Sequence, residues 1–322
     1  MILAAGLGTR MAPLSNALPK PALPILDEPM ILGMVRELSH QGIDSVIVNT
    51  HAHPERLEAA LCGAPVRVLI SREPNLLGSA GGIWAARRHL QGSEPFLVLN
   101  ADMRVELDVA ELHAVHRAAG SLATLLLRDD PRKQHFGTIG YSREAAVCRV
   151  CRITDRITVG LESGSGLFTG VQMMDPSIFA EFSADEVAQL MPDVYVPLLR
   201  SGKTLTAAFQ PSEMSWWPVG TPAELLDANL RSLQQLAQRG VGLTIDSSAR
   251  VQGEIVGPAW IGPGAEISAG AVLGPNVVMG AGVVVPEGYR ASEMLFLSGS
   301  RPPLGDPLKR AIAFDQEVWR DA

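Results

Sequence analysis

The chain has 322 residues, a formal net charge of −7 and three cysteines. A chain of this length is expected to hold two domains, because single hydrophobic cores stop growing near this size. The acidic balance argues against nucleic acid as a partner, since a nucleic-acid surface generally carries a basic patch. No apolar run reaches the roughly 18 to 20 residues of a membrane span, and three cysteines form no disulfide framework. We therefore expect a cytoplasmic protein with no membrane partner.

The chain opens with a short apolar strand followed by a glycine-rich turn. Residues 2–5 are apolar, as a buried parallel strand should be, and Gly6 and Gly8 allow backbone amides to approach an anion. Arg10 and Lys20 bracket the turn with two positive charges. The spacing matches neither the Walker pattern nor the dinucleotide fingerprint. The stretch therefore indicates another kind of nucleotide loop, with a tight strand-to-helix turn as the alternative.

The string G-L-G-T-R-M-x-P-L, followed by P-K-P, resembles the loop of the sugar-1-phosphate nucleotidylyltransferases, the nucleotide-sugar pyrophosphorylases of the mannose-1-phosphate guanylyltransferase type. The resemblance implies an α/β, Rossmann-like nucleotidyltransferase domain with a mostly parallel central sheet. It also implies that Arg10 and Lys20 are catalytic residues that hold the triphosphate and the leaving pyrophosphate. The loop residues that it assigns to nucleotide binding are Leu3, Ala4, Ala5, Gly6, Gly8 and Thr9.

Apolar periodicity predicts alternating helices and strands in the next part of the chain. A helix is expected within residues 27–42, a strand over 45–49, a helix over 55–61 and a strand over 66–70. This alternation is typical of parallel βαβ units. His51 and His53 follow the second strand, and without a third ligand we interpret them as loop histidines.

A second small-residue turn, Glu73-Pro74 followed by L-G-S-A-G-G, leads into a helix. In the resembling family this position holds the nucleobase, which implies contacts from Glu73, Gly78, Ser79 and Gly81. A carboxylate accepts from two adjacent donors of guanine but from only one on uracil or thymine. The turn therefore favours GTP and leaves UTP and dTTP open. A helix start lined by small residues for packing is the alternative.

An apolar strand over residues 96–99 ends in Asn100-Ala101-Asp102. Open α/β sheets build their sites just past such strands. The resemblance implies that Asp102 binds the catalytic Mg²⁺, whereas a lone aspartate at this position is more often a helix cap. Five residues separate it from the helix expected near Asp108, which weakens the capping alternative. His113 and His116 on that helix are expected to be solvated.

A strand is expected over residues 122–127, and F-T-G-V-Q at 168–172 matches the sugar-side strand of the family. The resemblance implies that the sugar is bound by Asn100, Gly137, Thr169 and Gly170. Many branches of the family place Glu-Lys-Pro just before this strand, with the lysine on the sugar phosphate. This chain has Glu-Ser-Gly at 162–164, so the phosphate contact is left to Arg152 or Arg156 as candidates.

The family's second metal ligand is the aspartate of W-x-D-x-G-T-P, and here the string reads W-W-P-V-G-T-P. Pro218 occupies the aspartate position and cannot bind Mg²⁺. The rest of the motif has a structural reason, because Thr221 and Glu224 form a capping box with proline at the first helical position. The helix that starts there is expected to end at Gly240.

From about residue 243 an aliphatic residue recurs every six positions, at Ile255, Ile261, Ile267, Leu273, Met279 and Val285. This resembles the hexapeptide left-handed parallel β-helix. The expected domains are therefore a nucleotidyltransferase domain at 1–240, a β-helix at 241–290 and a C-terminal tail at 291–322. The coil contains no histidine for acyl transfer, so we expect a role in homo-oligomer assembly or support.

These features favour nucleotidyl transfer. A sugar 1-phosphate oxygen would attack the α-phosphorus of an NTP and expel pyrophosphate, with positioning and charge neutralisation supplying the rate. The alternative is a catalytically impaired regulatory paralogue that binds nucleotide-sugars and has lost turnover through Pro218. The sequence does not identify the sugar.

Overall fold

The computed structural model describes the chain except for residues 17, 93, 134–136, 145–146, 183–186 and 322. The described residues form two compact units, one of residues 1–7 and 31–216 and the other of residues 8–30 and 217–322. The domain boundaries expected at residues 240 and 290 stay predictions.

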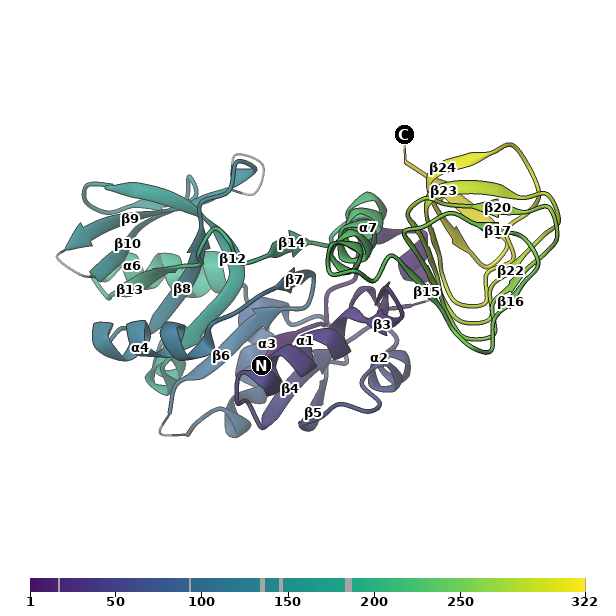
Figure 1. Cartoon of the computed structure of the whole chain (residues 1–322). Coiled ribbons are helices and arrows are strands. Elements are labelled where there is room, and N and C mark those ends of the chain that lie inside the picture. The colour runs from purple at the N-terminus through teal and green to yellow at the C-terminus, as the bar shows by residue number, and fades with distance from the viewer. Residues whose placement is uncertain (17, 93, 134–136, 145–146, 183–186, 322) are drawn as a thin grey trace. The chain divides into compact units, whose positions relative to one another are not determined.

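The first unit is built on one large mixed sheet (Figure 1). Its strands, in hydrogen-bonded order, are β11 (Ile157–Thr158), β10 (Val147–Ile153), β13 (Leu205–Phe209), β8 (Ala123–Arg128), β12 (Gly164–Met174), β6 (Phe96–Asn100), β1 (Ile2–Leu3), β4 (Ser45–Thr50) and β5 (Arg67–Arg72), with β9 (Thr138–Glu144) pairing β10 and β12. The predicted parallel βαβ region is confirmed, because β6, β1, β4 and β5 pair in parallel. The antiparallel β12 separates these strands from the parallel pair of β8 and β13.

Helices cover both faces of this sheet because its central strands are apolar on both sides. Along β6, Leu97 and Leu99 belong to one buried cluster and Val98 to the other, as the alternation of a strand requires. The first cluster includes residues of α1 (Met30–His40), α2 (Pro54–Ala60) and α4 (Val109–Ala119). The second includes residues of α3 (Gly78–Ala86) and α6 (Val196–Arg200). The expected α/β class is confirmed. The expectation of a mostly parallel sheet is wrong, because β12 pairs antiparallel with β6, β8 and β9, and β10 pairs antiparallel with β9, β11 and β13.

The predicted solvation of His116 is wrong. Its side chain is 2% exposed, and Nδ1 lies 2.9 Å from the Thr124 hydroxyl. Helical spacing places residue 116 one turn after the buried Leu112, so it faces the sheet, while His113 is half-buried.

Among the residues that the structure describes, no helix combines the length and the apolar character of a membrane span.

The second unit contains the helix α7 (Pro222–Gln238), which starts as its sequence predicts. Thr221 is the N-cap, its hydroxyl accepts from the Glu224 amide at 3.3 Å, and Pro222 is the first helical residue. The reciprocal bond of the capping box differs from expectation, since Glu224 Oε2 accepts from the amide of Gly220 at 2.7 Å. The helix buries Leu225 and Leu226 in a cluster with residues of the glycine-rich loop segment, and β2 (Pro24–Ile25) and β3 (Glu28–Pro29) form a small hairpin there.

The rest of this unit is a coil of short strands that stack in three parallel ladders. The ladders are β15 (Leu243–Ile245), β18 (Ala259–Ile261) and β21 (Val277–Met279); β16 (Arg250–Val251), β19 (Glu266–Ile267) and β22 (Val284–Val285); and β17 (Glu254–Ile255), β20 (Val272–Leu273) and β23 (Arg290–Phe296). Ala259 pairs with Val277 and Glu266 with Val284, so one step is 18 residues, or three hexads.

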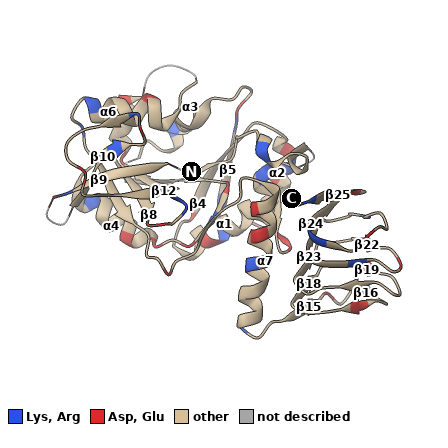
Figure 2. Cartoon of the chain, turned by 90° about the horizontal axis from the view of Figure 1, so that it is seen from above, with Lys and Arg blue, Asp and Glu red and all other residues tan. Residues whose placement is uncertain are grey.

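Five of the six predicted inward residues, from Ile261 to Val285, are no more than 1% exposed, whereas Ile255 in the first turn of the coil is half-buried. Charged residues are sparse along the coil (Figure 2). Strands within residues 291–321, which were expected as part of a tail, extend the sheet instead. The strand β24 (Leu308–Phe314) pairs in parallel with β23, and β25 (Glu317–Arg320) pairs antiparallel with β24.

Candidate functional site

Four neighbouring parallel strands of the first unit, β6, β1, β4 and β5, end at the same edge of the sheet, and predicted site residues lie at the ends of three of them. Ala4 and Ala5 follow β1, Glu73 follows β5, and Asn100 ends β6 with Asp102 just beyond. Ala4 and Ala5 are buried, Leu3 is half-buried and Gly6 is exposed. This edge is where open α/β sheets bind ligands.

A buried chain of hydrogen bonds connects the ends of β1, β4 and β5. The amide of Ala4 donates to Asn49 Oδ1 at 2.7 Å, and Asn49 Nδ2 donates to Glu73 Oε1 at 2.7 Å. Glu73 Oε2 accepts from the amide of Leu77 at 3.2 Å. Glu73 is 4% exposed and Asn49 2%. The carboxylate expected at the base thus already accepts two bonds within the protein.

Asn49 was missed by sequence reasoning. The only signal was a polar residue at the end of the apolar string S-V-I-V-N. Because a buried polar side chain is normally hydrogen-bonded, a strand that ends in a buried asparagine points to a partner on a neighbouring strand.

The small residues that begin α3 contact residues 188–190. The amides of Ala80 and Gly81 donate to the carbonyl of Ala188, at 2.9 and 3.1 Å. The Ser79 amide and hydroxyl lie 3.3 and 3.1 Å from Gln189 Oε1. Gly78 has φ +75°, and a Cβ there would lie 2.5 Å from the carbonyl oxygen of Ala188. These donors of Ser79 and Gly81 therefore serve the fold, and nucleotide contact by this turn stays a prediction.

The structure brings Asn100, at the end of β6, and Gly170, within β12, together. Gly170 has φ +86°, and a Cβ there would lie 3.0 Å from Asn100 Nδ2. Thr169 is 1% exposed, and its hydroxyl donates to the carbonyl of Leu126 at 2.8 Å. The hydroxyl of Thr169 is thus used inside the sheet. Gly137, with φ +74°, lies directly before β9.

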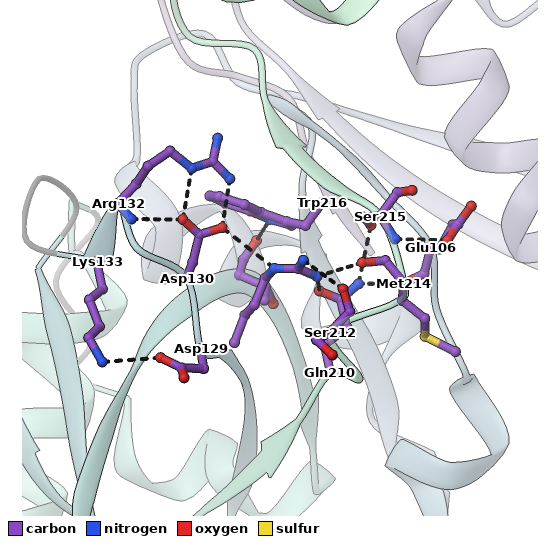
Figure 3. Close-up of polar contacts among 12 residues, drawn as sticks. Glu106, Asp129, Asp130, Arg132, Lys133, Gln210, Ser212, Met214, Ser215 and Trp216 are labelled. Atoms are coloured by element: carbon purple, nitrogen blue, oxygen red, sulfur yellow. Dashed lines mark hydrogen bonds and ion pairs between the residues drawn. The ribbon is translucent and has the colours of Figure 1, made fainter. Parts of the chain in front are cut away.

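A charged cluster that the sequence did not reveal lies beside β12 (Figure 3). Asp130 is 4% exposed and accepts from Arg132 Nε at 2.8 Å and Nη2 at 2.7 Å. These bonds hold the pKa of Asp130 at about 2, well below its ordinary value. The Arg132 guanidinium lies 5.2 Å from the ring centroid of Trp216, whose indole N–H donates to the carbonyl of Thr169 at 2.9 Å. The string R-D-D-P-R-K was the only sequence signal.

Arg128 anchors the segment that precedes Trp216. Its Nη1 donates to Gln210 Oε1 at 3.0 Å and to the carbonyl of Met214 at 2.5 Å, and Nη2 donates to the carbonyl of Ser212 at 3.1 Å. Arg128 Nε also lies 3.5 Å from Asp130 Oδ2. These hydrogen bonds therefore fix residues 210–214, which precede the W-W-P string.

Asp102 is the half-buried carboxylate past β6. Within the described part of the chain, no group of three or more His, Cys, Asp or Glu side chains is arranged to hold a metal. Mg²⁺ is commonly held by one or two carboxylates together with substrate phosphates and water. The carboxylate of Asp102 fits a metal that takes its other ligands from the substrate.

Arg152, a candidate for binding the sugar phosphate, uses all of its N–H donors within the protein. Its five N–H groups match five hydrogen bonds, two to Glu162 and three to Thr138 and Thr154. The structure therefore assigns Arg152 to the β9–β10 region of the sheet. Arg156 is exposed.

The second unit holds the predicted catalytic side chains. Gly8 has φ +62°, and a Cβ there would lie 3.3 Å from Cβ of Lys20. A Cβ at Gly220 would lie 3.1 Å from Arg10 Nη2. The two cations therefore each lie beside a glycine of a motif. Thr9 and Arg10 are exposed and Lys20 is half-buried, as is Pro218 at the end of β14 (Trp216–Pro218).

Several known proteins resemble this chain over most of its length. A probable mannose-1-phosphate guanylyltransferase of Arabidopsis thaliana is 29% identical over 313 residues, which cover 93% of this chain and 81% of that protein. The UTP–glucose-1-phosphate uridylyltransferase of Synechocystis is 25% identical over 319 residues, covering 84% and 80%. Among solved structures, HddC of Yersinia pseudotuberculosis matches with a TM-score of 0.59 at 21% identity, covering 72% of this chain and 97% of that one. A UDP-glucose pyrophosphorylase of Acinetobacter matches with a TM-score of 0.58 at 20% identity, covering 74% and 97%.

The two structural matches show the fold. The sequence profile of the family described as "Nucleotidyl transferase" matches residues 1–235, well over half of the chain. The chain belongs to the nucleotidyl transferase family.

Proposed function

We propose that this protein transfers a nucleoside monophosphate from an NTP to a sugar 1-phosphate, releasing pyrophosphate and forming an NDP-sugar. The observation that carries the proposal is the gathering of motif residues after β1 and β5, at the end of β6 and within β12, at the edge of an α/β sheet where ligands bind. The named activities of its relatives, guanylyl and uridylyl transfer to sugar 1-phosphates, support it.

The reaction needs no covalent nucleophile. The sugar phosphate oxygen attacks the α-phosphorus in line, and the protein contributes positioning and positive charge. In the second unit, Arg10 and Lys20 are proposed to neutralise the triphosphate and the leaving pyrophosphate. In the first unit, we propose backbone contacts to the nucleotide from the end of β1 and from Gly78, and to the sugar from Asn100 and Gly170.

We propose GTP as the nucleotide and mannose 1-phosphate as the first sugar phosphate to test. The guanylyltransferases among the relatives favour this pair. The carboxylate of Glu73 supports it less directly than the sequence suggested, because both of its oxygens already accept hydrogen bonds in the protein.

We propose Mg²⁺ as the cofactor, held by Asp102 together with substrate phosphates. When bound, the ion would neutralise charge on the phosphates. Asp102→Asn should therefore raise the Mg²⁺ concentration needed for half-maximal activity, whereas Asp108→Asn, which alters only the cap of α4, should not.

A regulatory, nucleotide-sugar-binding paralogue is the alternative, and Pro218 is the observation that favours it. Pyrophosphate release measured over a matrix of GTP, UTP and dTTP with several sugar 1-phosphates distinguishes the two. Turnover on any pair removes the alternative. If no pair turns over but an NDP-sugar raises the melting temperature, the transferase proposal fails.

Pro218→Asp is the sharper probe, with Pro222→Ala in the same motif as its control. We expect Pro218→Asp to increase turnover or Mg²⁺ affinity, because it restores a carboxylate where the family has one. No change would mean that another group already fills that place.

We further propose that residues 1–240 are the transferase domain and that 241–290 form a left-handed β-helix. Three parallel ladders with an 18-residue step support the β-helix.

We propose that the coil mediates homo-oligomer assembly. Its first strand, β15, is an edge strand of the sheet, and the side chains of Leu243 and Ile245 on it are 50% and 42% exposed. Sedimentation should show an oligomer that Leu243→Glu weakens; a monomeric wild type would contradict this.

A further inference from the structure

Asn49 bridges two segments that the sequence assigns to the same ligand. Its Oδ1 accepts from the amide of Ala4, at the end of β1, and its Nδ2 donates to Glu73, at the end of β5. Since the oxygen can only accept and the amino group can only donate, its partners fix the orientation of this side chain.

The bridge continues into the turn before α3. Glu73 receives Asn49 on one carboxylate oxygen and the amide of Leu77 on the other. Asn49 and Glu73 are almost completely buried, so a lost partner would leave a polar group away from water without compensation. The hydrogen bonds therefore fix the end of β1 relative to the turn that leads to Gly78.

The helix α3 leaves room for this pair. A Cβ at Gly82 would lie 2.6 Å from Glu73 Oε1 and 2.7 Å from Asn49 Nδ2, closer than real Cβ atoms approach their neighbours. The second glycine of the G-G pair thus has a packing reason that is separate from nucleotide contact. A methyl group at this position would displace the pair without removing either hydrogen-bonding side chain.

We propose that Asn49 is a positioning residue for nucleotide binding, which it supports through Glu73 and the amide of Ala4. The inference rests on the proposed function, because the two segments that it connects are those assigned there to the nucleotide. Asn49 fixes their separation, and that separation determines how well one base is preferred over another. No contact between Asn49 and substrate is required.

The test compares Asn49→Leu and Gly82→Ala with the wild type. For each protein, the nucleotide Kd is measured by calorimetry, and KM is measured for the NTP and for the sugar 1-phosphate. The ratio of kcat/KM between GTP and UTP is determined as well. We expect both variants to weaken nucleotide binding by roughly tenfold and to reduce the GTP to UTP ratio, with the sugar 1-phosphate KM unchanged.

Gly82→Ala keeps the proposal testable if Asn49→Leu does not fold. Alanine has the higher helix propensity, so a weaker Kd in this variant would not come from a weaker helix. Asn229→Leu is the matched control, because Asn229 is also fully buried and also accepts from a backbone amide, that of Leu26, at 2.7 Å. It should lower the melting temperature and leave Kd, KM and the base ratio unchanged.

A purely structural role for Asn49 would give the pattern of the control. Lower melting temperatures in Asn49→Leu and Gly82→Ala, with unchanged nucleotide Kd and base ratio, would overturn the inference. The proposed function fails separately, if the wild type binds nucleotide but turns over no substrate pair; the Kd comparison then still tests the positioning role. A wild type that binds no nucleotide contradicts both.

Discussion

The guanidinium of Arg152 donates to both carboxylate oxygens of Glu162, at 2.6 Å from Nε and 3.0 Å from Nη2. Many members of the resembling family have Glu-Lys-Pro just before the strand that corresponds to β12, and Glu162 corresponds to the glutamate of that string. In this chain, Glu162 binds Arg152 of β10 and so connects that strand to the segment before β12. These hydrogen bonds raise the pKa of Arg152 and lower the pKa of Glu162.

Arg152→Lys should therefore reduce stability and leave sugar phosphate binding unchanged. A lysine cannot reproduce five hydrogen bonds, so we expect a loss on the order of 1–3 kcal/mol in the free energy of unfolding. Urea unfolding and the KM for the sugar 1-phosphate test this. Arg156→Ala is the counterpart, with the opposite expectation of a raised KM and little loss of stability. A raised KM in Arg152→Lys at wild-type stability would contradict the assignment.

Asp130 should stabilise the protein in a way that is lost in acid. Its pKa is lowered to about 2 by Arg132, below the unfolded value near 4, so the stabilisation is complete above about pH 4 and is lost as the pH falls toward 2. We expect Asp130→Asn to cost on the order of 1–2 kcal/mol at neutral pH, allowing for solvent screening at the half-exposed Arg132. The difference between variant and wild type should shrink below pH 4.

The control for Asp130 is its neighbour. Asp129 pairs with Lys133 at the surface, where its side chain is 89% exposed. Asp129→Asn should change the unfolding free energy little at any pH, because exposed ion pairs contribute little. Equal pH profiles for the two variants would show that burial of Asp130 has no energetic consequence.

Much of the first unit could be predicted from the sequence because its central strands are buried on both faces. Such strands are short apolar runs, and the glycine-rich turns that follow them are visible at the strand ends. The strand–helix alternation from residue 45 to 100 was predicted for this reason. The hexad repeat was equally visible, since every sixth side chain points into the coil.

Side-chain direction and partner choice could not be predicted. The motif F-T-G-V-Q led to the expectation that Thr169 contacts a ligand. In the structure, the pairing of β12 with β8 is irregular between Phe168 and Gln172, and the Thr169 hydroxyl donates to the carbonyl of Leu126. Asn49 and Glu73 meet across two parallel strands, a pairing that depends on strand register and not on sequence distance. The Asp130 cluster joins a loop after β8 to one after β13, far apart in the chain.

His116 should make the protein less stable as the pH falls below about 6.5. Burial lowers its pKa, so the unfolded chain binds a proton in a pH range where the folded protein does not. Stability is therefore complete above the unfolded pKa and declines below it. His116→Gln should reduce this decline between pH 7 and pH 5 in urea unfolding more than His113→Gln on the same helix does, because burial is the largest cause of the lowered pKa. An unchanged slope in His116→Gln would contradict the burial argument.

Gly220→Ala should weaken nucleotide binding by displacing Arg10. The added Cβ would lie 3.1 Å from Arg10 Nη2 and 3.1 Å from Glu224 Oε2, so one of the two must shift. Glu224 is fixed by its bond from the Gly220 amide, which leaves the exposed guanidinium as the group that moves. Gly220, in the string W-W-P-V-G-T-P, therefore has a structural role that does not depend on an aspartate at position 218.

We expect the NTP KM to rise severalfold in Gly220→Ala, as for the loss of one charged hydrogen bond, and the melting temperature to stay nearly constant. Gly242→Ala, where a Cβ meets nothing within 4 Å, is the control. If both alanine variants keep the wild-type KM, the guanidinium of Arg10 is not held by this glycine, and its place in nucleotide binding must depend on other contacts.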